Sequence, residues 1–105
     1  MHDGDSLRLD KWLWHARFAK TRSMATRLIE QGEVLLDGRA AKPHHPVRVG
    51  DRVALLLGHF QHHVEIRALG ARRGPPAEAR LLYVEASRPR IVPREAWEAI
   101  VDLEA

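Results

Sequence analysis

Six basic side chains lie between residues 8 and 27, where they meet a single acid, Asp10. These basic residues are Arg8, Lys11, Arg17, Lys20, Arg22 and Arg27. The whole chain of 105 residues has a formal net charge of only +3, so the segment holds more positive charge than the molecule as a whole. Such a local excess indicates a polyanionic partner, with nucleic acid as the first candidate. A solvated helix surface explains the charge equally well. The positions of the basic residues on the predicted helices must therefore distinguish the two interpretations.

Two hydroxyl groups, those of Thr21 and Ser23, stand among these cations. Thr21 is predicted to cap a helix that continues to about residue 31, because its side-chain oxygen can accept a backbone N–H. Free amides, a positive dipole end, two cations and two hydroxyls together suit a phosphate oxygen. An ordinary capped helix with exposed arginines is the alternative for this short motif.

Two helices are predicted to position these groups. In the first, over 9–19, the period of 3.6 places one set of side chains on the buried side: Leu9, Trp12, Leu13, Ala16 and Ala19. In the second, the buried set is Met24, Ala25, Leu28 and Ile29. Gly32 is placed to end the second helix, since the residue after a helix often needs a positive φ. Asp10 is expected to have a structural role, pairing with a neighbouring arginine or with the helix end.

Two large rings, Trp14 and Phe18, fall on the charged side of the first helix. They can stack on bases. We favour a cover made by another part of the chain, because exposed apolar patches are usually avoided. The predicted cover is the stripe of Trp97, Ile100 and Val101 on a last helix over 93–103.

The middle of the chain predicts a small sheet. Strands are expected over 33–36, 52–57 and 60–69, with a tight turn at Asp37-Gly38. Pro75 and Pro76 are expected to start a short helix, because proline is tolerated in the first turn. The predicted fold class is α+β, with two N-terminal helices packed on a small, mainly antiparallel sheet and short C-terminal helices.

The sequence offers little for catalysis or cofactor binding. It has no glycine-rich phosphate loop, and its serines lack a nucleophile-elbow context. His62 and His63 would point to opposite faces of a strand, so we expect no metal site there. With no catalytic motif in view, we also expect no cofactor and no enzymatic activity. The absence of cysteine predicts a reducing cytoplasm. The longest apolar run, residues 53–57, is too short for a bilayer, so no membrane partner is expected.

The stretch RLDKWLW, followed by KTRSMATRLIEQGEVLLDGR and KP, resembles the S4-type RNA-binding domain. It is similar in particular to the ribosome-associated heat shock protein branch of that family. The resemblance runs from residue 8 to about residue 57, and extends weakly to 72–85. It implies the alpha-L motif, in which two helices pack on a small antiparallel sheet and read structured RNA.

The resemblance also implies an RNA-contacting set of residues. In this chain these residues are Arg8, Lys11, Thr21, Arg22, Ser23, Arg27, Gln31 and Lys42. The charge of the segment adds Arg17 and Lys20 to the predicted RNA-binding set. The helix residues of this set also follow from their charge and position, whereas Gln31 and Lys42 come from the resemblance alone.

The function that the resemblance implies is non-catalytic binding of ribosomal RNA on the large ribosomal subunit, in heat-stress rescue or recycling of stalled subunits. Peptidyl-tRNA is a further implied partner, and a monomer is expected. Members of that branch often end in a basic tail, whereas this sequence ends in an acidic segment. The predicted division is a leader over 1–7, an RNA-binding domain over 8–70 and a C-terminal extension over 71–105. The alternatives are a targeting module related to RNA-modifying enzymes, a DNA-binding helix-turn-helix protein and a protein-interaction module.

Overall fold

The computed structural model describes residues 5–104 of the chain, with the side chains of residues 5–99. The helices are α1 (Leu9–His15), α2 (Arg22–Glu30), α3 (Pro76–Ala79), which continues into a 3-10 turn (Arg80–Leu82), and α4 (Arg94–Glu104). The strands are β1 (Leu7–Arg8), β2 (Val34–Leu36), β3 (Arg39–Ala40), β4 (Pro46–Val47), β5 (Arg52–Leu57), β6 (Phe60–Ile66), β7 (Tyr83–Glu85) and β8 (Arg90–Ile91).

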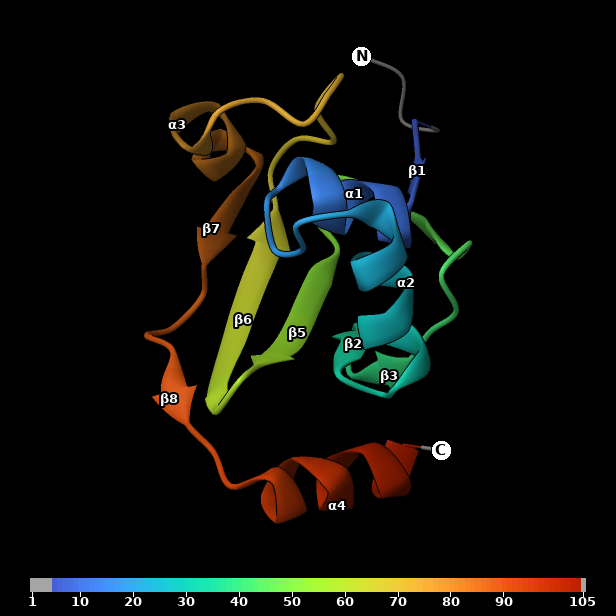
Figure 1. Cartoon of the computed structure of the whole chain (residues 1–105), viewed down its shortest axis with the longest axis vertical. Coiled ribbons are helices and arrows are strands. Elements are labelled where there is room, and N and C mark those ends of the chain that lie inside the picture. Colours follow the sequence, from blue (N-terminus) through green and yellow to red (C-terminus); the bar gives the residue numbers. More distant parts are fainter. Residues whose placement is uncertain (1–4, 105) are drawn as a thin grey trace.

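The strands form two antiparallel sheets. The larger has the order β3-β2-β5-β6-β7, with β8 also pairing with β6, and the smaller pairs β1 with β4. The β2–β3 hairpin turns at Asp37 and Gly38, which both have positive φ, 51° and 81°. Two positive φ angles match the tight turn that the Asp-Gly sequence predicts. Figure 1 shows α1 and α2 beside this sheet. The predicted α+β fold with two N-terminal helices is therefore confirmed.

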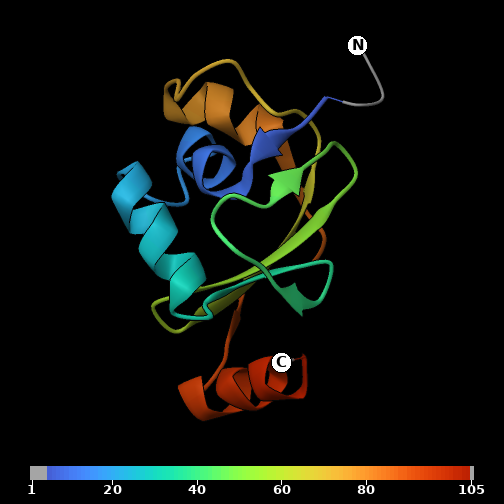
Figure 2. The same ribbon diagram turned by 90° about the vertical axis from the view of Figure 1, so that its right-hand side faces the viewer.

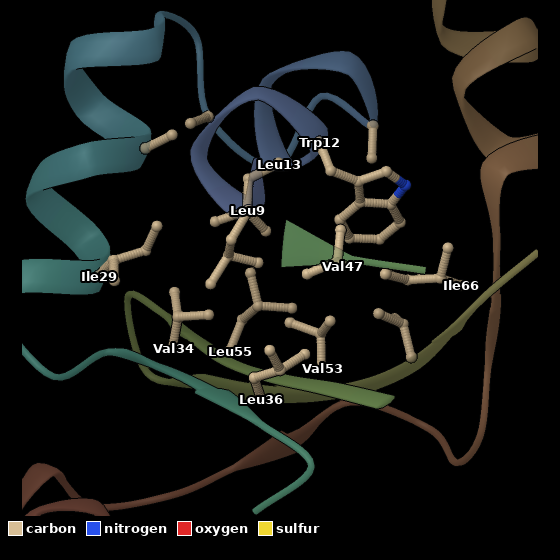
Figure 3. Packing of buried hydrophobic residues seen from close by; sticks show 14 of the residues in the cluster. Leu9, Trp12, Leu13, Ile29, Val34, Leu36, Val47, Val53, Leu55 and Ile66 are labelled. Atoms are coloured by element: carbon tan, nitrogen blue, oxygen red, sulfur yellow. The ribbon is translucent and has the colours of Figure 1, made fainter. Parts of the chain in front are cut away.

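The main core lies between the N-terminal helices and the larger sheet (Figure 3). Alternate residues of each strand face the helices, because successive side chains of a strand point to opposite sides. Trp12 and Leu13 of α1 and Ile29 of α2 pack there against β5, whose Val53 and Leu55 are at most 1% exposed. The indole nitrogen of Trp12 donates to the carbonyl oxygen of Ala68 at 3.0 Å.

A second, smaller cluster lies on the other face of the sheet. It joins Leu35 of β2 with Ala54 and Leu56 of β5, and all three pack against Trp97 of α4. The Trp97 indole nitrogen donates to the carbonyl oxygen of Gly32 at 2.8 Å. Figures 1 and 2 both place α4 at the far end of the molecule from α1.

The predicted docking of the last helix on Trp14 and Phe18 is therefore wrong. Trp97 covers the outer face of the sheet instead, because β2 and β5 are apolar on both faces and leave that side uncovered. Phe18 packs against Trp12 and Tyr83, with ring centroids 6.0 and 4.7 Å away. The side chains of Ile100 and Val101, which the same prediction used, lie outside the described residues.

The first helix is shorter than predicted: it ends at His15 and not at residue 19. Arg17 has a φ of 65°, which stops the helix. The amide of Phe18 donates to Leu13 and that of Arg17 to Trp14, which is the hydrogen-bond pattern of a Schellman cap. The second helix ends in the same motif at the predicted Gly32, whose φ is 75°. Only the C-terminal end of the second helix has the glycine that signals this motif in the sequence.

Other features differ from the prediction by a few residues. Met24 is 43% exposed and so does not belong to the buried side of α2, although Ala25 and Ile29 do. The strand β6 ends at Ile66, since the next two amides both turn to the carbonyl oxygen of Leu82. Leu7, placed in the predicted leader, pairs with Val47. Within residues 5–104, no helix combines the length and the apolar character that crossing a bilayer requires.

Candidate nucleic-acid interface

The carboxylate of Asp10 links the start of α1 to α2 and contacts two of the predicted cations. Arg8 binds it with two nitrogens, at 3.1 and 2.9 Å. Arg22, at the start of α2, approaches the same carboxylate to 3.5 Å, and the hydroxyl of Thr26 donates to it at 3.3 Å. Asp10 itself is only 2% exposed, whereas the side chains of Arg8 and Arg22 are 53% and 44% exposed. One buried acid thus fixes two arginines that still face solvent.

Asp10 stays ionised in this setting. Burial by itself raises the pKa of the carboxyl group, since a low dielectric disfavours the charged form. The hydrogen bonds and charge of Arg8, and then the charge of Arg22, outweigh burial and hold the pKa of Asp10 below its ordinary value. The same contact raises the pKa of Arg8. The predicted structural role of Asp10 is confirmed.

The loop after the first hairpin closes over the start of α1. The amide of Leu9 donates to His45 at 2.9 Å, and the amide of Asp10 donates to Pro43 at 3.1 Å. These contacts place the exposed Lys42 next to the segment that carries Arg8. They also satisfy first-turn amides of α1, so the loop carbonyls occupy this helix end.

The N-terminus of α2 is the more open helix end. The hydroxyl oxygen of Thr21 accepts the amide of Met24 at 3.1 Å, so Thr21 is the N-cap, as predicted. The amides of Arg22 and Ser23 precede the first intrahelical bond and are left for other acceptors. The side chains of Thr21, Arg22 and Ser23 are all exposed. The geometry and dipole of this end suit an anion.

The remaining predicted site residues do not share one place. Arg17 lies beyond the other end of α1 from Arg8, where its Nε donates to the carbonyl oxygen of Gly74 at 2.7 Å. Gln31 follows the last turn of α2, about 13 Å from Arg22 at 1.5 Å per residue. Arg27 is turned by about 100° around α2 from Thr26, which faces Asp10. Lys20 is exposed in the connection between the helices.

Two features of the interface were not predicted. Thr26 supports Asp10 from the second helix, and the only available signal was its spacing of four residues from Arg22, one helical turn. A cavity near Arg17 is lined by Arg80 and Tyr83, which are remote in sequence, so no local pattern indicates it. Among the described residues, no group of three potential metal-ligating side chains is close enough to hold an ion.

Comparison with known proteins places this arrangement in a family. Residues 7–53 match the model of the S4 domain. Heat shock protein 15 of Escherichia coli is 42% identical over 81 residues, which are 77% of this chain and 61% of that protein. The RQC P-site tRNA stabilizing factor of Halalkalibacterium halodurans is 37% identical over 60 residues, which are 57% of this chain and 68% of that protein.

A solved structure supports the same relationship. The structure of Vibrio cholerae Heat Shock Protein 15, described as trimeric, superposes with a TM-score of 0.76 at 41% identity. The match covers 79% of this chain and 84% of that one. The present chain spans about three fifths of the length of the Heat shock protein 15 sequences that it matches. On the sequence and structural matches together, the chain belongs to the S4 domain family and is homologous to Heat shock protein 15.

Proposed function

We propose that this chain is a non-catalytic RNA-binding protein that binds ribosomal RNA on the large ribosomal subunit. The proposed setting is the rescue or recycling of stalled subunits that carry a nascent chain on tRNA, in the cytoplasm. The names of the relatives support this setting, since one is a heat shock protein and another a P-site tRNA stabilizing factor. Its proposed partners are the RNA, the subunit and peptidyl-tRNA.

The observation that carries the proposal is the pair of exposed arginines, Arg8 and Arg22, held by the buried Asp10. A guanidinium that is already fixed loses little conformational freedom when it binds a phosphate. The open amides at the start of α2 add neutral donors beside these charges. Groups of this kind contact the sugar-phosphate backbone, so we expect recognition of RNA shape more than of base sequence.

The proposal is tested by removing two cations from α2. We expect Arg22→Ala combined with Arg27→Ala to weaken binding to ribosomal RNA by roughly tenfold or more, because each phosphate contact adds to the electrostatic attraction. The melting temperature should change little, because Arg27 is exposed and Asp10 keeps its two hydrogen bonds from Arg8 when the longer Arg22 contact of 3.5 Å is lost. The measurement is sucrose-gradient co-sedimentation with separated ribosomal subunits, followed by titration with RNA.

A charge-matched control uses Arg88→Ala combined with Arg90→Ala. These arginines are also exposed; Arg90 begins β8 and Arg88 lies two residues before it, outside the proposed interface. The control should bind the large subunit as the wild type does. Equal binding by the α2 double variant and the wild type would show that the interface is misplaced.

The DNA-binding alternative is less well supported by the geometry. Residues 16–21 connect α1 to α2, whereas a helix-turn-helix joins its helices by about three or four residues. Competition between duplex DNA and structured RNA at matched salt separates the two readings. We expect the RNA to win.

We further propose that residues 8–70 form the RNA-binding domain and that residues 71–105 form an extension of it. A monomer is the proposed binding unit, because Arg8, Asp10 and Arg22 come from one chain. Sedimentation equilibrium checks this proposal, and a stable trimer at micromolar concentration would contradict it.

A further inference from the structure

A cavity of about 240 Å³ lies between the connection that follows α1 and the segment from α3 to β7. Its lining combines two cations, three rings and one acid: Arg17, Arg80, Phe18, His62, Tyr83 and Glu85. Of these residues, the sequence predicts an RNA contact for Arg17 alone, and Arg17 lies away from the Arg8–Asp10–Arg22 cluster. Their combination of charge and aromatic surface therefore needs its own explanation.

The rings of this cavity are only partly covered. Phe18 and Tyr83 have centroids 4.7 Å apart, and the edge of His62 meets Phe18 at 6.4 Å. All three side chains are half-buried, so each keeps part of its surface open. Nucleobases stack on partly exposed aromatic rings whatever their sequence, because every base has a π-face.

The two cations are placed to neutralise a phosphate. The hydrogen bond from Arg17 Nε to Gly74 fixes this guanidinium at the mouth of the cavity. Within the described part of the chain, Arg80 has no ion pair. Both guanidiniums can therefore bind a phosphate without first breaking a salt bridge.

The acid of the cavity suits a different part of a nucleotide. Glu85 repels phosphate, but its carboxylate accepts hydrogen bonds from the amino groups of bases. Glu85 lies 3.5 Å from the ring nitrogen of His62. Burial, and then the charge of Glu85, raise the pKa of Tyr83, so its hydroxyl keeps its proton. The cavity thus offers cations for a phosphate and an acceptor for a base edge.

We propose that this cavity binds one unpaired nucleotide of the bound RNA, with its base against Phe18 and Tyr83 and its phosphate at Arg17 and Arg80. The inference rests on the proposed RNA-binding function. Proteins that read RNA often bind bases extruded from loops and bulges. The volume is below the roughly 300–1,000 Å³ of sites for drug-sized ligands, which fits a single base.

The test compares two RNA hairpins that differ only in one bulged adenosine. We expect the full chain to bind the bulged hairpin more tightly, by roughly fivefold or more, in fluorescence anisotropy, because base–aromatic stacking contributes at least that factor. A bulged uridine should bind less tightly than adenosine, since it has no amino group for Glu85. With 2-aminopurine at the bulge, its fluorescence should change on binding.

Variants locate the effect. Phe18→Leu should lower the affinity ratio between the bulged and plain hairpins to less than twofold. Arg80→Gln, at an exposed position, should lower the ratio without disturbing the fold. The control Arg88→Gln removes an exposed arginine elsewhere and should leave the ratio unchanged. Melting curves check that each variant is folded.

The outcomes separate this inference from the proposed function. Equal affinity of the wild type for both hairpins, with binding still sensitive to the α2 double variant, overturns the nucleotide site alone. Failure to bind either hairpin or the ribosomal subunit overturns both proposals. Adenosine monophosphate serves as a free-ligand arm. If it binds as tightly as the bulged hairpin, the ligand is a free nucleotide and the assignment to RNA fails.

Discussion

The two faces of the larger sheet are covered in different ways. On one face, α1 and α2 bury a continuous core, and on the other, Trp97 of α4 packs on a small apolar cluster while Arg94 pairs with Glu33 at 2.8 Å. Each face has a buried tryptophan whose indole nitrogen donates to a backbone carbonyl, Trp12 to Ala68 and Trp97 to Gly32. The anchoring hydrogen bond is thus the same. We therefore expect the Trp97 face, which buries less apolar surface, to hold its helix less firmly than the Trp12 face.

The face of Trp97 is also less completely filled. A cavity of about 530 Å³ lies beside this residue, and Leu35, Val53 and Ala54 are among its lining residues. The helix face, by contrast, holds the residues of the proposed RNA interface on a filled core. We therefore expect the interface to be insensitive to changes in α4.

The largest expected effect is on the filled face. Trp12→Ala should lower the free energy of unfolding by about 3–5 kcal/mol, because it removes a fully buried ring from the core. Urea denaturation followed by circular dichroism measures this loss. Trp12→Phe is the matched control, since it retains an aromatic ring and should cost less. A loss below about 1 kcal/mol for the alanine variant would contradict the packing described here.

The next effect concerns the buried acid on the same face. Asp10→Asn should lower the free energy of unfolding by about 2 kcal/mol at pH 7, because two arginines lose their charged partner. The folded state depresses the pKa of Asp10, so its contribution is present above the ordinary pKa of about 3.9 and is lost as pH falls through the folded value. Denaturation at pH 7 and below pH 3 measures this.

The control for this change is Asp5→Asn, which removes an exposed carboxylate. It should leave stability at pH 7 nearly unchanged. A gap between Asp10→Asn and the wild type that stays constant down to the lowest pH would argue against the ionised network.

The smallest effect is expected on the face of the sheet that Trp97 covers. Trp97→Ala should lower the global free energy of unfolding by only about 1–2 kcal/mol, because α4 can be released locally while the rest of the domain stays folded. A helix of 11 residues is marginal without packing, so its amides should lose protection from hydrogen exchange. Trp97→Phe should preserve part of that protection. A global loss as large as that of Trp12→Ala would remove the distinction between the two faces.

Local rules predicted the elements that carry their own signals. Thr21 as a cap, Gly32 as a helix end and Asp37-Gly38 as a turn each depend on neighbouring residues alone, and the structure has them there. The end of α1 has no such signal, since Arg17 adopts the conformation usually left to glycine. Its hydrogen bond to Gly74 spans 57 residues and belongs to the tertiary structure.

The arrangement of the sheet faces was harder to predict than its strands. An apolar run such as residues 53–57 predicts burial on both sides, but not which helix covers which side. The placement of Trp97 was therefore missed. The cavity formed by Phe18, Arg80 and Tyr83 was missed for the same reason, because segments about sixty residues apart build it.

The shared carboxylate of Asp10 also bears on how RNA binding responds to ionic strength. Each phosphate that a protein neutralises releases counterions from the nucleic acid. The slope of binding affinity against salt concentration reports the number of ions released. Arg8 and Arg22 arrive at the RNA with one of their two charges already balanced. The number of ions released should therefore be smaller than the number of arginines and lysines in contact.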